Sequence, residues 1–132
     1  MENMQNTTGL KEATTSVGPG NIVNKHLRSF QENNLEALMS DYTSKSVLIT
    51  QVATYTGREE ITAFFADLML HFPKQQFSLK LDNLVVNEEL VYIVWHAKTP
   101  SLEVPLGSDT FMIKDGKIAQ QTFVGQLNFI PR

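Results

Sequence analysis

The spacing of apolar residues changes at Pro73, and this change limits the chain to a small set of folds. Before Pro73, apart from a β-branched stretch at residues 47–56, apolar residues recur every three or four positions, which is the period of an amphipathic helix. After Pro73, apolar and β-branched residues gather in short runs separated by turn signals, as in strands. Helices followed by a run of antiparallel strands pack on one face of the sheet, so the pattern predicts an α+β fold.

Three helices are expected in the first half of the chain. The first begins at Asn21 as N-cap, and Asn33-Asn34 separates it from a short second helix. The third and longest spans residues 59–72, with acidic residues in its first turn, where the helix dipole favours them. The apolar positions of the first two helices are Ile22, Val23, His26, Leu27, Phe30, Leu35, Leu38, Met39 and Tyr42.

The expected strands form one curved antiparallel sheet wrapped around the long helix. A hairpin precedes Gly57, and the Asp115-Gly116 turn leads into the last strand. The sheet must curl to bury its apolar face, which leaves a cone with an internal pocket open at one end. The strand ranges are 47–50, 52–56, 77–86, 90–97, 102–104, 108–113 and 118–127.

The chain is expected to form one domain, residues 21–132, behind a polar leader. The leader, residues 1–20, ends in Gly18-Pro19-Gly20 and has at most a short helical turn around residues 10–13. A length of 132 residues suffices for one buried core and is too short for two.

Composition excludes several functional classes. A net charge of −3 with scattered Lys and Arg argues against nucleic-acid binding. The absence of cysteine removes disulfides and thiolate chemistry, and no apolar run is long enough to cross a membrane. His26, His71 and His96 lack metal-ligand spacing, and no phosphate-binding glycine loop is present. A cytoplasmic protein without metal or cofactor is therefore expected.

The order of elements between residues 21 and 129 resembles the nuclear transport factor 2-like superfamily. This superfamily includes ketosteroid isomerases, SnoaL-like polyketide cyclases, limonene epoxide hydrolases, dehydratases and binding subunits. The segments that carry the likeness are 57–61, 86–88 with 91–95, and 109–113 with 115–118. The resemblance implies a cone-shaped, cystatin-like α+β roll with an internal pocket. It also implies a homodimer through the convex sheet face, which would carry Tyr92, Val94, His96, Gln120, Thr122 and Val124.

Ketosteroid isomerases place three polar groups in this pocket, and the resemblance transfers their positions to this chain. The oxyanion-binding tyrosine falls on His26, the carboxylate base on Thr50 and the protonated aspartic acid on Asp109. A threonine hydroxyl is far too weakly basic to take a proton from carbon near neutral pH. The chain is therefore not a steroid isomerase of the known design.

Asp109 and His26 are the candidate catalytic residues. Asp109 shares strand parity with Phe111 and Ile113, so its carboxyl faces the cone, where burial raises its pKa and favours an acid or donor role. The alternative is a carboxylate that caps a turn and faces water. His26 either pairs with Asp109 as an acid–base partner or is an ordinary core histidine.

The candidate ligand-binding residues are predicted from strand parity and from the long helix. Trp95 offers a flat wall for a ring, or else packs purely as core. Gln121 either hydrogen-bonds a ligand carbonyl or pairs with Thr50 across the core. The full set is Thr50, Phe64, Ile93, Trp95, Phe111, Gln121 and Phe123.

Two functions fit these residues. The first is binding and cofactor-free acid–base transformation, of the isomerase, cyclase or dehydratase type, of a small apolar molecule with a carbonyl or hydroxyl group. The second is a non-catalytic ligand-binding or protein-interaction module of the same fold. Thr50 at the base position favours the second, and Asp109 with His26 favours the first, so the sequence leaves open whether the protein is an enzyme.

Overall fold

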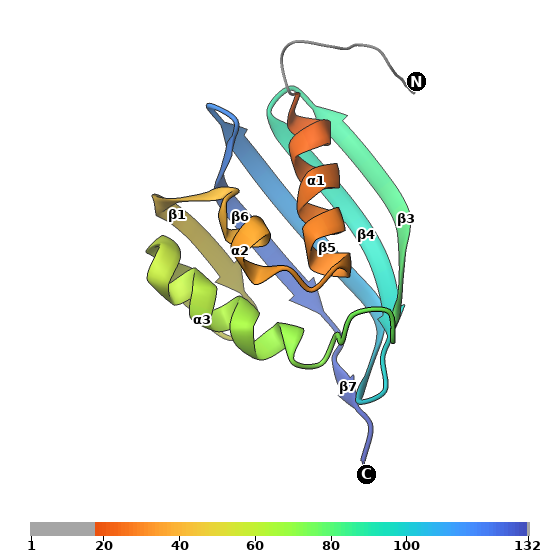
Figure 1. Cartoon of the computed structure of the whole chain (residues 1–132). Helices are drawn as coiled ribbons and strands as arrows, with labels where there is room; N and C mark the ends of the chain where they lie inside the picture. The colour runs from red at the N-terminus through yellow and green to blue at the C-terminus, as the bar shows by residue number, and fades with distance from the viewer. Residues whose placement is uncertain (1–17, 132) are drawn as a thin grey trace.

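Three α-helices precede most of the sheet, as the apolar spacing predicts. The structure is a computed structural model that describes residues 18–131, so the helical turn expected around residues 10–13 lies outside the described residues. The helices are α1 (Pro19–Gln31), α2 (Leu35–Met39) and α3 (Gly57–Met69). In Figure 1, α1 lies across the face formed by β3, β4 and β5, and α3 lies beside β1. The sheet therefore curves around α1 as well as α3, the helix expected to fill the cone.

The sheet contains seven strands in the order β2-β1-β6-β5-β4-β3, with β7 paired to β5. All neighbours are antiparallel except β1 and β6, which run parallel and correct the expectation of a wholly antiparallel sheet. The parallel pair joins segments that are distant in the chain, so no hairpin sets its direction. The strands are β1 (Tyr42–Thr50), β2 (Thr54–Thr56), β3 (Ser78–Asn87), β4 (Leu90–Lys98), β5 (Leu102–Lys114), β6 (Lys117–Gly125) and β7 (Asn128–Phe129).

Several predicted boundaries are wrong by a few residues. Helix α1 begins at Pro19 with Gly18 as N-cap, because a proline at the first helical position has its backbone angle already set for a helix. Tyr42, expected on the second helix, begins strand β1 instead. Residues 102–114 form one continuous strand where two were expected, and α3 ends three residues before position 72.

Alternation along β4 places the core as predicted. Val91, Ile93 and Trp95 are buried on the concave side, whereas Tyr92 and His96 are exposed on the convex side. The His96 side chain pairs there with Asp82, Nδ1 to Oδ2, at 2.8 Å. The convex face therefore carries the exposed residues that the sequence predicts.

Gly107 leaves room for the indole of Trp95 on the concave side of the sheet. The two residues are partners in the β4–β5 register. A Cβ atom added at Gly107 would lie 2.5 Å from Cε2 of Trp95, closer than packed carbon atoms approach. The ring of Trp95 lies nearly parallel to that of Phe123, with centroids 5.9 Å apart. The glycine thus fixes where the indole lies.

We predict that Gly107→Ala lowers the free energy of unfolding by about 1–3 kcal/mol, because the added methyl group must displace the indole. Urea denaturation measures the loss, and fluorescence of Trp95 reports the displaced ring. Gly18→Ala is the control, because no atom lies within 4 Å of the added carbon and alanine in place of glycine at this N-cap costs only about 0.5–1 kcal/mol. An equal and small loss in both variants would contradict this role of Gly107.

Candidate functional site

A cavity opens between the helices and the concave face of the sheet. The empty space in and around it measures about 490 Å³, a figure that includes open solvent at its mouth. Its polar side chains are His26 from α1, Asp109 from β5 and Gln121 from β6. Its apolar walls are formed by Leu27, Phe30, Phe64, Phe65, Leu68, Leu79, Ile93, Trp95, Phe111 and Phe123. The lining of the cavity is therefore mostly apolar and aromatic, with a few polar side chains among these walls.

Asp109 is the carboxyl group of this cavity, and its residue is only 8% exposed. One oxygen, Oδ1, accepts a hydrogen bond from Nε1 of Trp95 at 2.8 Å. The other, Oδ2, accepts from Nε2 of Gln121, also at 2.8 Å. Burial raises the pKa of Asp109, and the two hydrogen bonds and the charge of His26 offset only part of that effect. The alternative of a turn cap facing water is wrong.

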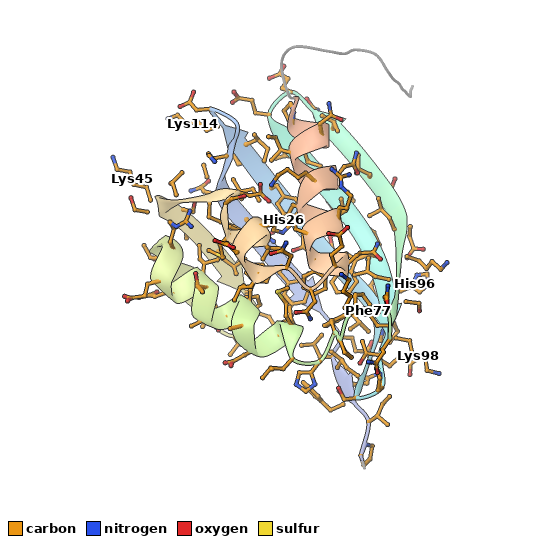
Figure 2. The ribbon with its side chains drawn as sticks, viewed as in Figure 1. His26, Lys45, Phe77, His96, Lys98 and Lys114 are labelled. Carbon is orange, nitrogen blue, oxygen red and sulfur yellow. The ribbon has the colours of Figure 1, made fainter. Side chains whose placement is uncertain are left out.

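His26 is buried between α1 and the sheet (Figure 2), but its partner is not the expected one. Its Nδ1 atom lies 3.2 Å from Oδ2 of Asp41, in the turn before β1, so the predicted direct pairing with Asp109 is wrong. Burial raises the pKa of Asp41, but hydrogen bonds and charges from His26 and Lys25 outweigh it and lower the pKa. An ionised carboxylate only accepts hydrogen bonds, so His26 carries a proton on Nδ1.

Tyr42 links the histidine to the opposite side of the cavity. Its hydroxyl donates to Oε1 of Gln121 at 2.5 Å and lies 3.5 Å from Nε2 of His26. Burial raises the pKa of Tyr42 well above its ordinary value, and the charges of Asp109 and Asp41 add to this effect. Tyr42 therefore stays a neutral phenol and keeps its single proton for hydrogen bonding.

Of the seven residues predicted to bind a ligand, Thr50 alone does not line the cavity. Its hydroxyl donates to the carbonyl of Ala53 and accepts from the amides of Val52 and Ala53, so it is held in the turn after β1. The suggested pairing of Gln121 with Thr50 is also wrong. The other six, for which ligand contact stays a prediction, are Phe64, Ile93, Trp95, Phe111, Gln121 and Phe123.

Asp41 and Tyr42 are the polar residues of this site that the sequence analysis missed. The apolar spacing predicts Tyr42 on the apolar side of a helix, whereas Tyr42 begins strand β1 and Asp41 directly precedes it. A tyrosine placed in the core needs a hydrogen-bond partner, and this rule was the available signal for Tyr42. Nothing in the spacing of the sequence marks Asp41 as the partner of His26.

Two further observations concern the described residues. Within residues 18–131, no group of three or more His, Asp or Glu side chains is placed to hold a metal ion. Among the helices of that range, none has both the length and the apolar character needed to span a membrane.

The sequence profile of the SnoaL-like domain matches residues 23–121. Three solved structures share the fold. An NTF2-like protein of unknown function from Cytophaga hutchinsonii is 12% identical (TM-score 0.67, covering 90% of this chain and 96% of that one). A candidate ketosteroid isomerase from Kribbella flavida is 11% identical (TM-score 0.65, 84% and 79%). A candidate polyketide cyclase from Sinorhizobium meliloti is 19% identical (TM-score 0.65, 77% and 92%).

These matches confirm the predicted fold and family resemblance. At such low identities the three structures establish the cone-shaped architecture alone. They do not show that the proteins share a chemistry. No curated protein sequence matches the chain.

We predict that Asp41→Asn lowers the free energy of unfolding at pH 7 by about 1–3 kcal/mol, through its weaker contacts with His26 and Lys25. Because folding lowers the pKa of Asp41, its ionised carboxylate stabilises the fold fully at pH values above the ordinary pKa of 3.8. This stabilisation is lost as the pH falls through the pKa that Asp41 has in the folded protein. Urea denaturation at several pH values should therefore show a difference from wild type that shrinks under acid conditions.

The exposed His96–Asp82 pair supplies the control for this prediction. Its side chains are 47% and 45% exposed, so solvent screens the interaction and Asp82→Asn should change stability little. A difference between wild type and Asp41→Asn that is equally large at every pH would contradict an ionised, stabilising Asp41.

Proposed function

The chain belongs to the SnoaL-like domain family, and on that premise we propose that it binds a small, largely apolar molecule with a carbonyl or hydroxyl group and transforms it by cofactor-free acid–base chemistry. The observation that carries the proposal is Asp109, a buried carboxyl group with a raised pKa in a cavity of apolar and aromatic walls. Carboxyl groups in such surroundings serve as acids or hydrogen-bond donors at neutral pH.

Asp109 has two uses toward a bound oxygen atom. In its protonated form it donates a hydrogen bond to a carbonyl oxygen and stabilises negative charge that develops there. In its ionised form it accepts a proton from a hydroxyl group or an activated carbon. His26 supplies the second group, because its proton on Nδ1 leaves Nε2 as the atom able to exchange a proton with a ligand.

The reaction classes that need only such groups are isomerisation, cyclisation and dehydration. Two structural neighbours are a candidate ketosteroid isomerase and a candidate polyketide cyclase, and both names belong to this group of reactions. The likeness to them shows a shared fold, motivates this choice of reaction classes and leaves both the reaction and the substrate open.

A non-catalytic binding module is the second candidate, and one observation favours it. Both oxygens of Asp109 already accept hydrogen bonds, from Trp95 and Gln121, so the carboxyl group is satisfied without a ligand. Thr50, where a steroid isomerase has its base, is held in a turn outside the cavity. In this candidate function the same polar groups orient the guest and transfer no proton.

We predict that aryl ketones and aryl alcohols quench the fluorescence of Trp95, the sole tryptophan, when they enter the cavity. Asp109→Leu should weaken the binding of both classes by about tenfold or more, because the ligand oxygen loses its partner, and should spare the matching hydrocarbon. Asp109→Asn should bind ligand and lose turnover. The outward-facing Gln120→Leu is the control.

Equal binding of the ketone and the hydrocarbon, by wild type and variant alike, would rule out recognition by Asp109. Mass spectrometry of the purified protein under native conditions tests the proposal independently by identifying a molecule that co-purifies with it. Turnover of a bound ketone that survives Asp109→Asn would favour another acid.

We also propose that a second copy of the chain covers the convex sheet face. Tyr92 and Val124 are exposed there, with Val124 55% accessible, and both lie on central strands. Val124→Glu should shift the protein from dimer to monomer in sedimentation equilibrium, because it places a charged group of each copy in the proposed apolar interface. Val52→Glu, at an 86% exposed position in the β1–β2 turn, is the control. A monomeric wild type would contradict the proposal.

A further inference from the structure

A path of hydrogen-bonding side chains crosses the core from Asp41 to Asp109. Asp41 contacts His26 Nδ1 at 3.2 Å, and His26 Nε2 lies 3.5 Å from the hydroxyl of Tyr42. Tyr42 then bonds Gln121 at 2.5 Å, and Gln121 bonds Asp109 at 2.8 Å. All five residues are buried, so water competes little for these bonds. Which group donates in each bond therefore depends on which side chains of the path carry a proton.

One complete pattern places a proton on His26. Asp41 is ionised and takes the proton on Nδ1, so the Nε2–H group of a protonated His26 donates to Tyr42. The hydroxyl of Tyr42 donates to Oε1 of Gln121, and Nε2 of Gln121 donates to an ionised Asp109. Every donor then faces an acceptor.

The second complete pattern places the same proton on Asp109. The carboxylic O–H donates to the oxygen of Gln121 once the amide has turned by about 180°. The amide nitrogen then donates to Tyr42, and the hydroxyl of Tyr42 donates to Nε2 of a neutral His26. Trp95 donates to Oδ1 of Asp109 in both patterns.

With any other number of protons on His26 and Asp109, at least one group along the path lacks a hydrogen-bond partner. With neither group protonated, the single proton of Tyr42 faces two acceptors, His26 Nε2 and Gln121 Oε1, and one of them stays unmatched. With both groups protonated, the extra proton on Asp109 has no acceptor in the chain, because both oxygens face N–H donors. A buried unmatched group costs about 1–3 kcal/mol.

We propose that Tyr42 and Gln121 are positioning residues that couple His26 to Asp109, so that these two cavity groups hold one proton between them. Besides Asp41, which bonds His26, the charged groups next to this path are Lys25, which bonds Asp41, and Arg58 of α3, whose Nη1 donates to the backbone carbonyl of Tyr42 at 2.7 Å. The rings of Phe65 and Phe111 pack against His26 and carry no charge. The cavity then presents one acid and one base in either state.

This inference deepens the proposed function, because a paired acid and base suits a substrate that loses a proton at one position and gains one at another. The coupling itself exists without any ligand and is measured without one. A chain that shows coupling but binds no ketone or alcohol would refute the proposed function and leave the coupling intact. Ligand binding without coupling would refute the coupling and leave the proposed function intact.

The test is a pH titration of the whole chain by NMR, with labelled histidine rings and aspartate carboxyl groups. In wild type we expect the His26 nitrogens and the Asp109 carboxyl carbon to change over the same pH interval. The side chain of Asp109→Asn can donate to Gln121 as the protonated acid does, which favours neutral His26. In this variant the proton affinity of His26 should therefore fall by about tenfold, which shifts its NMR transition about one pH unit lower.

Breaking the path separates coupling through hydrogen bonds from attraction between charges through space. In a Tyr42→Phe background, Asp109→Asn should change the proton affinity of His26 by less than about threefold. Gln121→Leu breaks the next link and gives the same readout if Tyr42→Phe does not fold. An undiminished tenfold effect in a broken background would overturn the proposal.

A matched control comes from the second histidine–aspartate pair of the chain. Asp82→Asn changes the partner of His96 on the exposed face, at a contact of 2.8 Å. It should alter the His96 signals and leave those of His26 and Asp109 unchanged. A shift of His26 in this variant would show that the readout reports general charge, and that result also counts against the proposal.

Discussion

The burial of the Asp109 carboxyl group is the constraint on which the rest of the site depends. A carboxyl group without partners in an apolar cavity is costly, so each oxygen must meet a donor. Trp95 and Gln121 supply these donors from the two strands that flank β5. Their positions require the antiparallel β4–β5 and β5–β6 registers, so the sheet geometry and the chemistry of the site are fixed together. Gly107 extends this dependence, because it leaves room for the indole whose N–H group reaches Asp109.

The sequence predicted the parts of this arrangement that follow from local alternation. Along β4 and β6, parity alone places Trp95 and Gln121 on the same side as the Asp109 carboxyl group, and the structure confirms this. Local patterns say nothing about which strand lies beside which. The neighbours β1 and β6 are separated by most of the sheet in sequence, so their parallel pairing was not predictable from turn signals. The hydrogen bond between Tyr42 and Gln121 crosses this interface and was missed for that reason.

The partner of His26 was missed for a different physical reason. Its side chain position follows from helical spacing, but its hydrogen bond depends on how α1 packs over the start of β1. The turn after α2 places the Asp41 carboxylate beside the imidazole, while Lys25 binds the other oxygen of the same carboxylate. A carboxylate between two basic side chains has a lowered pKa, in contrast to Asp109, where burial dominates. The pKa values of two aspartates in one polar path are therefore shifted in opposite directions, because their neighbours differ.

This difference bears on the acid–base chemistry proposed for this SnoaL-like chain. The steroid isomerase arrangement would require a carboxylate at Thr50, whereas the hydroxyl of Thr50 serves the turn after β1. The titratable groups that remain at the cavity are His26 on α1 and Asp109 on β5. Asp109 bonds Gln121 of β6 directly, and His26 is connected to Gln121 through Tyr42. A proton acceptor for a bound molecule must then come from His26 or an ionised Asp109. The ionised Asp41 fixes the proton on Nδ1 of His26, so only Nε2 can serve, and that atom faces the hydroxyl that leads to Asp109.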